Sequence, residues 1–197
     1  MVGTPIGNLG DLSVRCREAL AEADAIVCED SRRAGLLLKH FAIDKKPLLV
    51  ANAHTEARRS TEIIARLEAG EMVALTSDAG MPGVSDPGQR VVRAVIEAGL
   101  SVEVVPGPTA AVTALVASGL ATDLFVFEGF LPRKGVLRRQ GLAAIAGVRR
   151  TVVLYESPKR VAATLKDLSE VCDGERPVAV ARDLTKLLEE VVQGSLD

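Results

Sequence analysis

The stretch ALTSDAGMPGVSDPGQRVV, residues 74–92, indicates the fold class of this chain. It begins as a buried strand, breaks into small residues, glycines and prolines, and resumes as a helix, with Asp86 and Pro87 expected at its cap and first turn. In an open α/β sheet, ligands bind beyond the carboxyl ends of the strands. The position of Asp78 directly after the strand, with Gly80 and Gly83 in the turn, therefore predicts a ligand site in this loop.

The same alternation of strand and helix patterns runs along the whole chain. Strands are expected at residues 25–28, 47–52, 72–76 and 101–105, with helices and short turns between them. This alternation indicates a parallel α/β sheet. Beyond residues 119–123 (GLATD), a second domain is expected, with strands at residues 124–130, 150–157 and 177–184. The basic segment LPRKGVLRR, residues 131–139, is expected to be a loop.

The predicted domains are residues 1–120 and 121–197, each of the α/β class, and both look shortened at their outer ends. Two residues precede the first glycine turn, whereas a strand usually has about five or six. The final segment VVQGSLD, residues 191–197, is not expected to supply an element that closes the second sheet.

The composition excludes several classes of protein. Of 197 residues, 48% are hydrophobic and 25% charged, which is typical of a soluble globular protein. Aromatic residues make up 3%, too few for a stacking platform for single-stranded nucleic acid, and the net charge of −2 gives no overall attraction for nucleic acid. Three scattered cysteines and two histidines, His40 and His54, predict no metal site. No membrane-length apolar run or signal peptide is present, so a cytoplasmic protein is predicted.

Two further loops follow strands in the predicted first domain. VGTPIGNLGD, residues 2–11, places Gly3 and Gly7 in a strand-to-helix turn, but it lacks the GxGxxG dinucleotide fingerprint. VPGPTAAV, residues 105–112, places Thr109 near a helix N-terminus. Taken singly, the first loop is explained equally well as a structural turn, and the second is explained better by capping and helix packing. We expect all three loops to converge on one edge of the sheet.

An ordered set of motifs resembles the ribosomal RNA methyltransferases of the tetrapyrrole methylase superfamily. These motifs are TPIGNLGD, EDSRR, SDAGMPGVSDPG, PGPTAAVTAL, EGFLPRK, YESPKR and ARDLTK, and together they cover essentially the whole chain. The resemblance implies two α/β domains, with a mainly parallel first sheet, a mixed second sheet, and S-adenosylmethionine bound in a cleft between the domains. It also implies a homodimer.

By position in these motifs, the resemblance implies a set of residues that hold the cofactor. They are Pro5, Asp78, Gly80, Met81, Thr109 and Ala110 in the first half, and Tyr155, Glu156, Ala181 and Arg182 in the second. Tyr155 is explained equally well as an aromatic residue of the core.

The reaction implied is methylation of the ribose 2′-hydroxyl of a cytidine in small-subunit (16S) rRNA near the decoding centre. The protein must align that hydroxyl with the methyl group, and a base or a neighbouring cation would assist. Candidate catalytic residues are Glu29, Asp30 and Lys186, although Asp30 is also explained as a helix cap and Lys186 as a solvated residue.

Contact with RNA would depend on local basic residues. The candidates are Arg32, Arg33, Arg133, Lys134, Arg138 and Arg139. Two other hypotheses stay open at this point: a methylase of a porphyrin or corrin precursor, and a module that binds RNA or the ribosome without catalysis. The motifs at residues 29–33, 128–134 and 181–186 favour the RNA enzyme over the porphyrin or corrin methylase. Binding of the cofactor would argue against the non-catalytic module.

Overall fold

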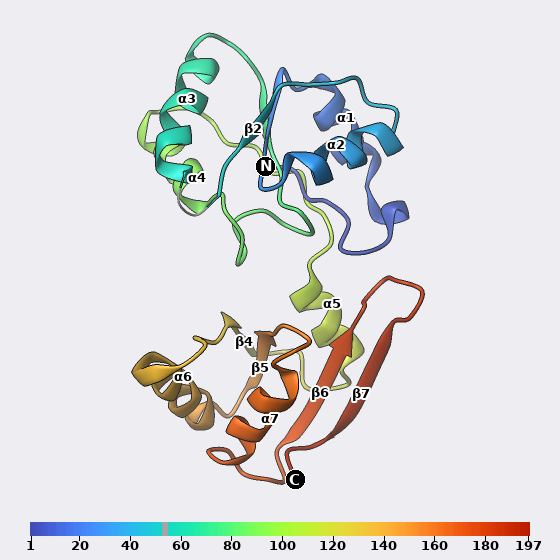
Figure 1. Ribbon diagram of the computed structural model, residues 1–197, viewed down its shortest axis with the longest axis vertical. Coiled ribbons are helices and arrows are strands. Elements are labelled where there is room, and N and C mark those ends of the chain that lie inside the picture. The colour runs from blue at the N-terminus through green and yellow to red at the C-terminus, as the bar shows by residue number, and fades with distance from the viewer. Residues whose placement is uncertain (53–54) are drawn as a thin grey trace. The chain divides into compact units, whose positions relative to one another are not determined.

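The computed structural model describes residues 1–52 and 55–197, which divide into two compact units, Met1–Thr109 and Ala110–Asp197 (Figure 1). This division falls before the domain boundary expected after residue 120. The helix of residues 110–117 groups with the second unit because Ala111 and Leu115 pack against Val153. Each unit is described by itself below.

The first unit is a parallel sheet with helices on both faces. Its sheet has the order β2-β1-β3, and Ile26 of β1 pairs with Leu48 on one side and Ala74 on the other. The elements are a short 3-10 helix η1 (Leu9–Asp11), α1 (Val14–Glu22), β1 (Ala25–Cys28), α2 (Ser31–His40), β2 (Leu48–Val50), α3 (Glu56–Glu68), β3 (Val73–Leu75) and α4 (Gln89–Glu97).

Alternate residues of β1 face opposite sides of this sheet and build two core layers. Ile26 packs in a cluster with Cys16 and Leu20 of α1, whereas Val27 packs in another with Ile63 of α3 and Val91 of α4. A strand buried on both faces is typical of a parallel sheet covered by helices. The predicted fold class of this half is therefore confirmed.

The strand expected at residues 101–105 is reduced to a single bridge. Val105 pairs in parallel with Val2, while Val2 N donates to the carbonyl of Leu75, the last residue of β3. The remaining residues, 101–104, form no ladder; beside them, the ammonium group of Met1 donates to the carbonyl of Glu103 at 2.7 Å.

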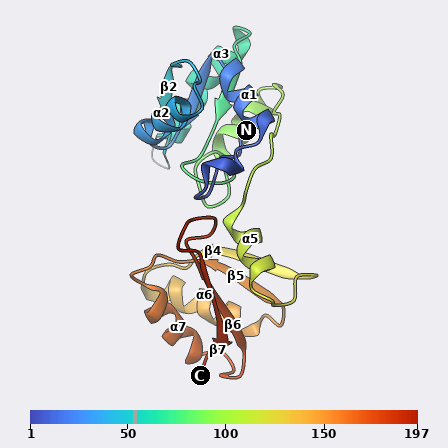
Figure 2. The same ribbon diagram turned by 90° about the vertical axis from the view of Figure 1, so that its right-hand side faces the viewer.

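The second unit contains two strand pairs and three helices in the described residues. β4 and β5 are parallel, with a bulge between Phe127 and Gly129, and β6 and β7 are antiparallel (Figure 2). The elements are α5 (Ala110–Ala117), β4 (Phe125–Phe130), α6 (Gly135–Gly147), β5 (Thr151–Tyr155), α7 (Val161–Ser169), β6 (Pro177–Arg182) and β7 (Glu190–Ser195). The mixed strand directions agree with the predicted class.

Two local expectations in this unit are wrong. Residues 135–139, expected to be part of a loop, form the start of α6, because Leu142 and Ile145 further along the helix anchor it in a core cluster. Residues 190–195, expected to give no closing element, form β7 because a hairpin lays them against β6 over its whole length. Among the described residues, none of the helices has the length and apolar content that crossing a membrane requires.

Candidate functional site

The three predicted ligand loops of the first unit do converge. The backbones of Gly3 and Gly107 touch, such that a Cβ on Gly3 would lie 2.6 Å from the Cα of Gly107. Thr4 and Gly80 exchange two backbone hydrogen bonds of 2.9 and 3.0 Å, and Gly107 N donates to Met81 Sδ over 3.2 Å. The strand-end loops therefore form one assembly in which glycine is required at the point of closest approach.

The loop of residues 77–88 is held from both of its ends. At the first end, Ser77 Oγ donates to the carbonyl of Gly80, 3.1 Å away. At the second, a carboxylate that the sequence did not point to, Glu56 at the start of α3, accepts three bonds through Oε1. Its donors are the backbone N–H groups of Gly88 (2.9 Å), Arg90 (2.9 Å) and Val91 (3.3 Å).

Glu56 thus takes over the capping role that the sequence assigned to Asp86. The residue at the N-cap position of α4 is Gly88, whose φ of 135° lies in the region that favours glycine. The expected cap at Asp86 is wrong because two turn residues, Pro87 and Gly88, separate it from Gln89, the first residue of α4. The local sequence does not predict that Glu56 caps α4, since Glu56 belongs to a different helix, α3.

Asp78 joins the ends of β1 and β3. Its Oδ1 accepts from the backbone N–H of Asp30 over 3.2 Å, and its Oδ2 pairs with Arg33 Nη1 at 3.2 Å. Asp30 itself caps α2 by accepting from the N–H of Arg32, whose guanidinium also pairs with it at 2.9 Å. These bonds to Arg32 lower the pKa of Asp30 to about 2. The helix-cap explanation of Asp30 is therefore supported, and a carboxylate this acidic is a weak base.

Glu29 has the opposite electrostatic character. Burial is the largest cause that raises the pKa of Glu29. The neighbouring carboxylates of Asp78 and Asp86 raise this pKa further, while the Arg33 guanidinium lowers it. Burial also raises the pKa of Asp86, against a hydrogen bond with Ser77. We call Glu29, Asp30, Asp78 and Asp86 the acidic edge. Such a set can attract a cation, and Glu29 is better suited than Asp30 to accept a proton.

The other expected cofactor residues of the first half lie within the same loops. Pro5 is buried next to the Thr4–Gly80 bridge, and Met81 contributes the sulfur that Gly107 contacts. Thr109 and Ala110 lie at the junction of the two units, with Ala110 beginning α5.

In the second unit, Tyr155 and Glu156 lie at the end of β5. Tyr155 Oη accepts from the N–H of Ala111 over 3.1 Å, and its ring packs against Phe127 (5.0 Å between centroids) and Phe130 (5.5 Å). The carboxylate of Glu156 is nearly buried and binds Thr164 Oγ1 at 2.7 Å and Arg160 at 3.3 Å. These contacts favour the core-aromatic explanation of Tyr155 as much as a ligand role.

The remaining candidates of that half lie on the β6–β7 hairpin. Ala181 and Arg182 end β6, and Arg182 pairs with Glu190 of β7 at 2.5 Å. Lys186 lies in the connecting turn, half exposed, and pairs with Asp183 at 3.0 Å. The structure thus gives Lys186 a local partner, in agreement with the solvated explanation.

The basic residues near α6 fall into two kinds. Arg138 has an 11% exposed side chain that pairs with Asp167 at 2.6 Å and donates to Thr164 Oγ1 at 3.1 Å and the carbonyl of Pro132 at 3.0 Å. It is therefore a structural link between α6 and α7 and not a loop cation, which corrects the placement expected from the sequence. Arg133, Lys134 and Arg139 are exposed.

Among the described residues, the structure contains no group of three histidine, cysteine, aspartate or glutamate side chains that could hold a metal ion. Of the two histidines, His54 lies outside the described residues.

Solved structures with this arrangement define the class of protein. The uroporphyrin-III-C-methyltransferase from Thermus thermophilus superposes with a TM-score of 0.68 and 25% sequence identity, covering 99% of this chain and 83% of that one. Uroporphyrin-III C-methyl transferase from the same organism, complexed with S-adenyl homocysteine, shares the fold with a TM-score of 0.62 and 20% identity over 99% of this chain and 82% of that one. The fold is that of an α/β methylase with two units.

A family model places the chain within this class. The model of the tetrapyrrole (corrin/porphyrin) methylases matches residues 1–197, so the chain belongs to that family. It is also 49% identical, over 196 residues, to the ribosomal RNA small subunit methyltransferase I of Synechocystis sp. (strain ATCC 27184 / PCC 6803 / Kazusa), covering 100% of this chain and 70% of that protein. The resemblance seen in the ordered motifs is confirmed.

Proposed function

We propose that this protein is an S-adenosylmethionine-dependent methyltransferase that modifies the ribose 2′-hydroxyl of a cytidine in small-subunit (16S) rRNA near the decoding centre. The observation that carries the proposal is the 49% identity to the Synechocystis ribosomal RNA methyltransferase along the full chain. The proposal includes a cytoplasmic location and a homodimeric assembly, which the resemblance to this family supports.

The chemistry of the acidic edge suits this cofactor. S-adenosylmethionine carries a sulfonium and an ammonium group, and both cations are favoured beside the carboxylates at the ends of β1 and β3. When bound, the sulfonium supplies an electrophilic methyl group. In this proposal, Asp78 and the loop around Gly80 and Met81 hold the methionine and ribose parts, with Pro5, Thr109 and Ala110 beside them. Tyr155, Glu156, Ala181 and Arg182 remain proposed contacts from the second unit.

The protein's own residues would align the ribose hydroxyl and remove its proton. Glu29 is the preferred acceptor because its pKa is raised, whereas Asp30 is strongly acidic and engaged as a cap. Lys186 is proposed as a nearby cation in the reaction, although its partner Asp183 would have to release it. Exposed Arg133, Lys134 and Arg139, with Arg32 and Arg33, would contact RNA phosphates.

A transfer assay with methyl-labelled S-adenosylmethionine tests the proposal. Unmethylated small ribosomal subunits, their naked rRNA and a porphyrin precursor are offered in parallel. Label on a ribose of the subunit RNA is the expected result. The likeness to uroporphyrin-III-C-methyltransferase favours the second candidate, a porphyrin or corrin methylase, and label on the porphyrin would overturn the RNA assignment. Binding of the RNA without either cofactor binding or methyl transfer would support a non-catalytic RNA-binding module.

The role of Glu29 is tested by the acid limb of the pH–activity profile. The Asp86 carboxylate raises the pKa of Glu29, so D86N should move the limb to lower pH. Arg33 lowers the same pKa, so R33M should move the limb to higher pH. E29Q should remove the limb together with most of kcat. If D86N and R33M shift the limb in the same direction, or not at all, Glu29 is not the titrating base.

A further inference from the structure

Phe130, the last residue of β4, is a large apolar residue that stays 56% exposed. It lies at the carboxyl end of the parallel pair β4–β5, opposite Tyr155, the last residue of β5. The two rings pack with 5.5 Å between their centroids and an angle of 55° between their planes. The Phe130 ring is thus supported by protein on one side and open to a ligand on the other, at the end of the strands where ligands of α/β proteins bind.

A β-bulge determines the face of the sheet on which Phe130 lies. The register of β4 against β5 shifts between Phe127 and Gly129, so Glu128 is an extra residue without a partner, and Gly129 has a φ of 62°. Successive side chains of a strand alternate between faces, and one extra residue reverses the alternation. Phe130 therefore shares a face with Phe127, and both rings contact Tyr155.

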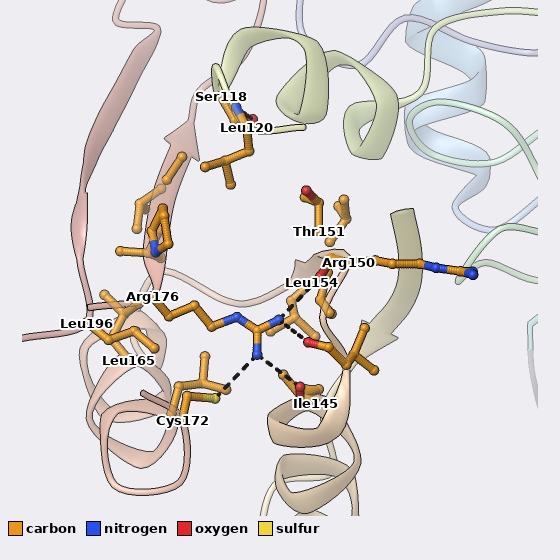
Figure 3. A pocket seen from close by; sticks show the side chains of 18 of the residues that line it. Ser118, Leu120, Ile145, Arg150, Thr151, Leu154, Leu165, Cys172, Arg176 and Leu196 are labelled. Atoms are coloured by element: carbon orange, nitrogen blue, oxygen red, sulfur yellow. Dashed lines mark hydrogen bonds between the residues drawn. The ribbon is translucent and has the colours of Figure 1, made fainter. Parts of the chain in front are cut away.

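The opposite face of these strands would bury an aromatic ring. There Leu154 of β5 packs in a cluster with Leu142 and Ile145 of α6, and Leu154 and Ile145 also line the cavity shown in Figure 3. Leu131, the residue after Phe130, belongs to this cluster and is 6% exposed. Burial of an apolar side chain is favourable, so stability alone does not account for a bulge that buries the leucine and leaves the phenylalanine exposed.

The backbone that follows Phe130 is fixed by two guanidinium groups. Arg160 Nη2 donates to the carbonyl of Leu131 at 3.4 Å, and Arg138 Nη1 donates to the carbonyl of Pro132 at 3.0 Å. Both arginines are largely buried and are themselves held by carboxylates. The position of the exposed ring is therefore set by contacts with α6 and with the segment before α7.

Two exposed cations, Arg133 and Lys134, come directly after this fixed backbone. An aromatic face close in sequence to cations suits a nucleotide of a single-stranded RNA segment, because aromatic side chains stack on unpaired bases while arginine and lysine bind phosphates. The net charge of the chain is −2, so attraction for RNA has to be local, as it is here.

We propose that Phe130 stacks on an unpaired base of the substrate RNA while Arg133 and Lys134 bind the adjacent phosphates. The inference rests on the rRNA methyltransferase activity proposed above and adds a base-binding residue to it. A ribose hydroxyl is aligned with a methyl donor only when its nucleotide is held in a defined position, and stacking holds a nucleotide whatever its base. Phe130 is thus a substrate-binding residue and takes no part in the proton transfer.

Variants of Phe130 test for the aromatic ring itself. F130L keeps an apolar side chain against Tyr155 but has no ring face, whereas F130Y and F130W keep one. In the transfer assay with unmethylated small ribosomal subunits, F130L should raise KM for the subunits about tenfold, the usual effect of losing one stacked base, with kcat close to that of the unmodified chain. F130Y and F130W should restore the KM, and the KM for S-adenosylmethionine should stay unchanged in every variant.

The matched control is F125L. Phe125 is also exposed, but it begins β4, at the opposite end of the strand, so F125L should leave both KM values unchanged. An unchanged KM for the subunits in F130L would mean that the ring contacts no base and would overturn the inference. A raised KM for S-adenosylmethionine in F130L would assign the ring to the adenine of the cofactor, with the same consequence. Failure of the unmodified chain to methylate the subunits would instead overturn the proposed function, on which the inference rests.

Tryptophan fluorescence observes the stack directly. The chain contains no tryptophan, so F130W and F125W each carry a single one. Naked small-subunit rRNA, at concentrations that saturate binding in a filter assay, should quench the emission of F130W and not that of F125W, because a stacked base quenches the indole. Equal emission changes in the two variants would refute the stack, and quenching of F130W by S-adenosylhomocysteine alone would assign it to the cofactor.

Discussion

The replacement of Glu56 by glutamine is expected to loosen the loop of residues 77–88 more than any local sequence feature suggests. Glu56 is 5% exposed, and its Oε1 accepts three backbone N–H groups at the start of α4. E56Q keeps the shape and one acceptor oxygen but removes the negative charge from the positive end of the helix. The loop that carries Asp78 is attached directly to that helix end.

The magnitude follows from these bonds. A hydrogen bond to a charged group contributes about 1.5–3 kcal/mol, and a charge at a partly buried helix terminus contributes up to about 2 kcal/mol. Because the amide oxygen still accepts, E56Q should lose about 1–2 kcal/mol of the free energy of unfolding. E56A should lose about 3–4 kcal/mol, because three N–H groups are left without their acceptor. For a unit of this size, E56Q corresponds to a melting temperature lower by about 5–10 °C.

Thermal unfolding followed by circular dichroism measures this change, and a titration with S-adenosylmethionine measures its effect on the loop. The matched control is E68Q, the same chemical change at an exposed position of α3, which should alter stability by less than about 0.5 kcal/mol. E56Q should also weaken cofactor binding, whereas E68Q should not. If the two variants unfold at the same temperature, the capping role assigned to Glu56 is refuted.

Three further outcomes are expected. G3A should destabilise the chain by about 1–3 kcal/mol, because its Cβ would lie 2.6 Å from backbone atoms of the facing loop, whereas G35A, with nothing within 4 Å of its Cβ, should be neutral or stabilising in urea unfolding. R138M should lower the melting temperature through the loss of about 2–3 kcal/mol, while R139M should leave it unchanged and weaken RNA binding in a filter assay; the reverse pattern would contradict the structural assignment of Arg138. Cys28, whose pKa burial raises to about 11, should remain unmodified by iodoacetamide at pH 8 as judged by mass spectrometry, and rapid labelling would refute its burial.

The elements that the sequence predicted well are those whose signal is local. Residues 25–28 are a short apolar run, and all four are buried because helices cover both faces of the sheet. The elements that it missed depend on contacts with distant segments. Helix α6 begins at Gly135 without a side-chain cap, so its start carries no capping signal, and its stability comes from packing of Leu142 and Ile145. Strand β7 is mostly exposed and exists because β6 pairs with it.

The candidate site divides in the same way. The three glycine-containing loops follow predicted strands, and because parallel strands end at one edge, their convergence could be predicted without any contact information. The roles of Glu56 and Arg138 could not. Each is a charged residue on a helix, and the sequence alone does not distinguish one that binds a distant element from one that faces solvent.

The acidic edge departs from what stability alone would favour. The pKa values of Glu29 and Asp86 are raised above their ordinary values of 4.5 and 3.8, so the folded chain binds their protons more tightly than the unfolded chain does. Their stabilising contribution is therefore present below those ordinary values and is lost as the pH rises through the raised ones. At neutral pH the carboxylates repel one another and oppose folding. A cationic ligand at this edge reverses that effect, because its charge lowers the same pKa values. S-adenosylmethionine should accordingly stabilise the first unit more than S-adenosylhomocysteine, which lacks the sulfonium charge.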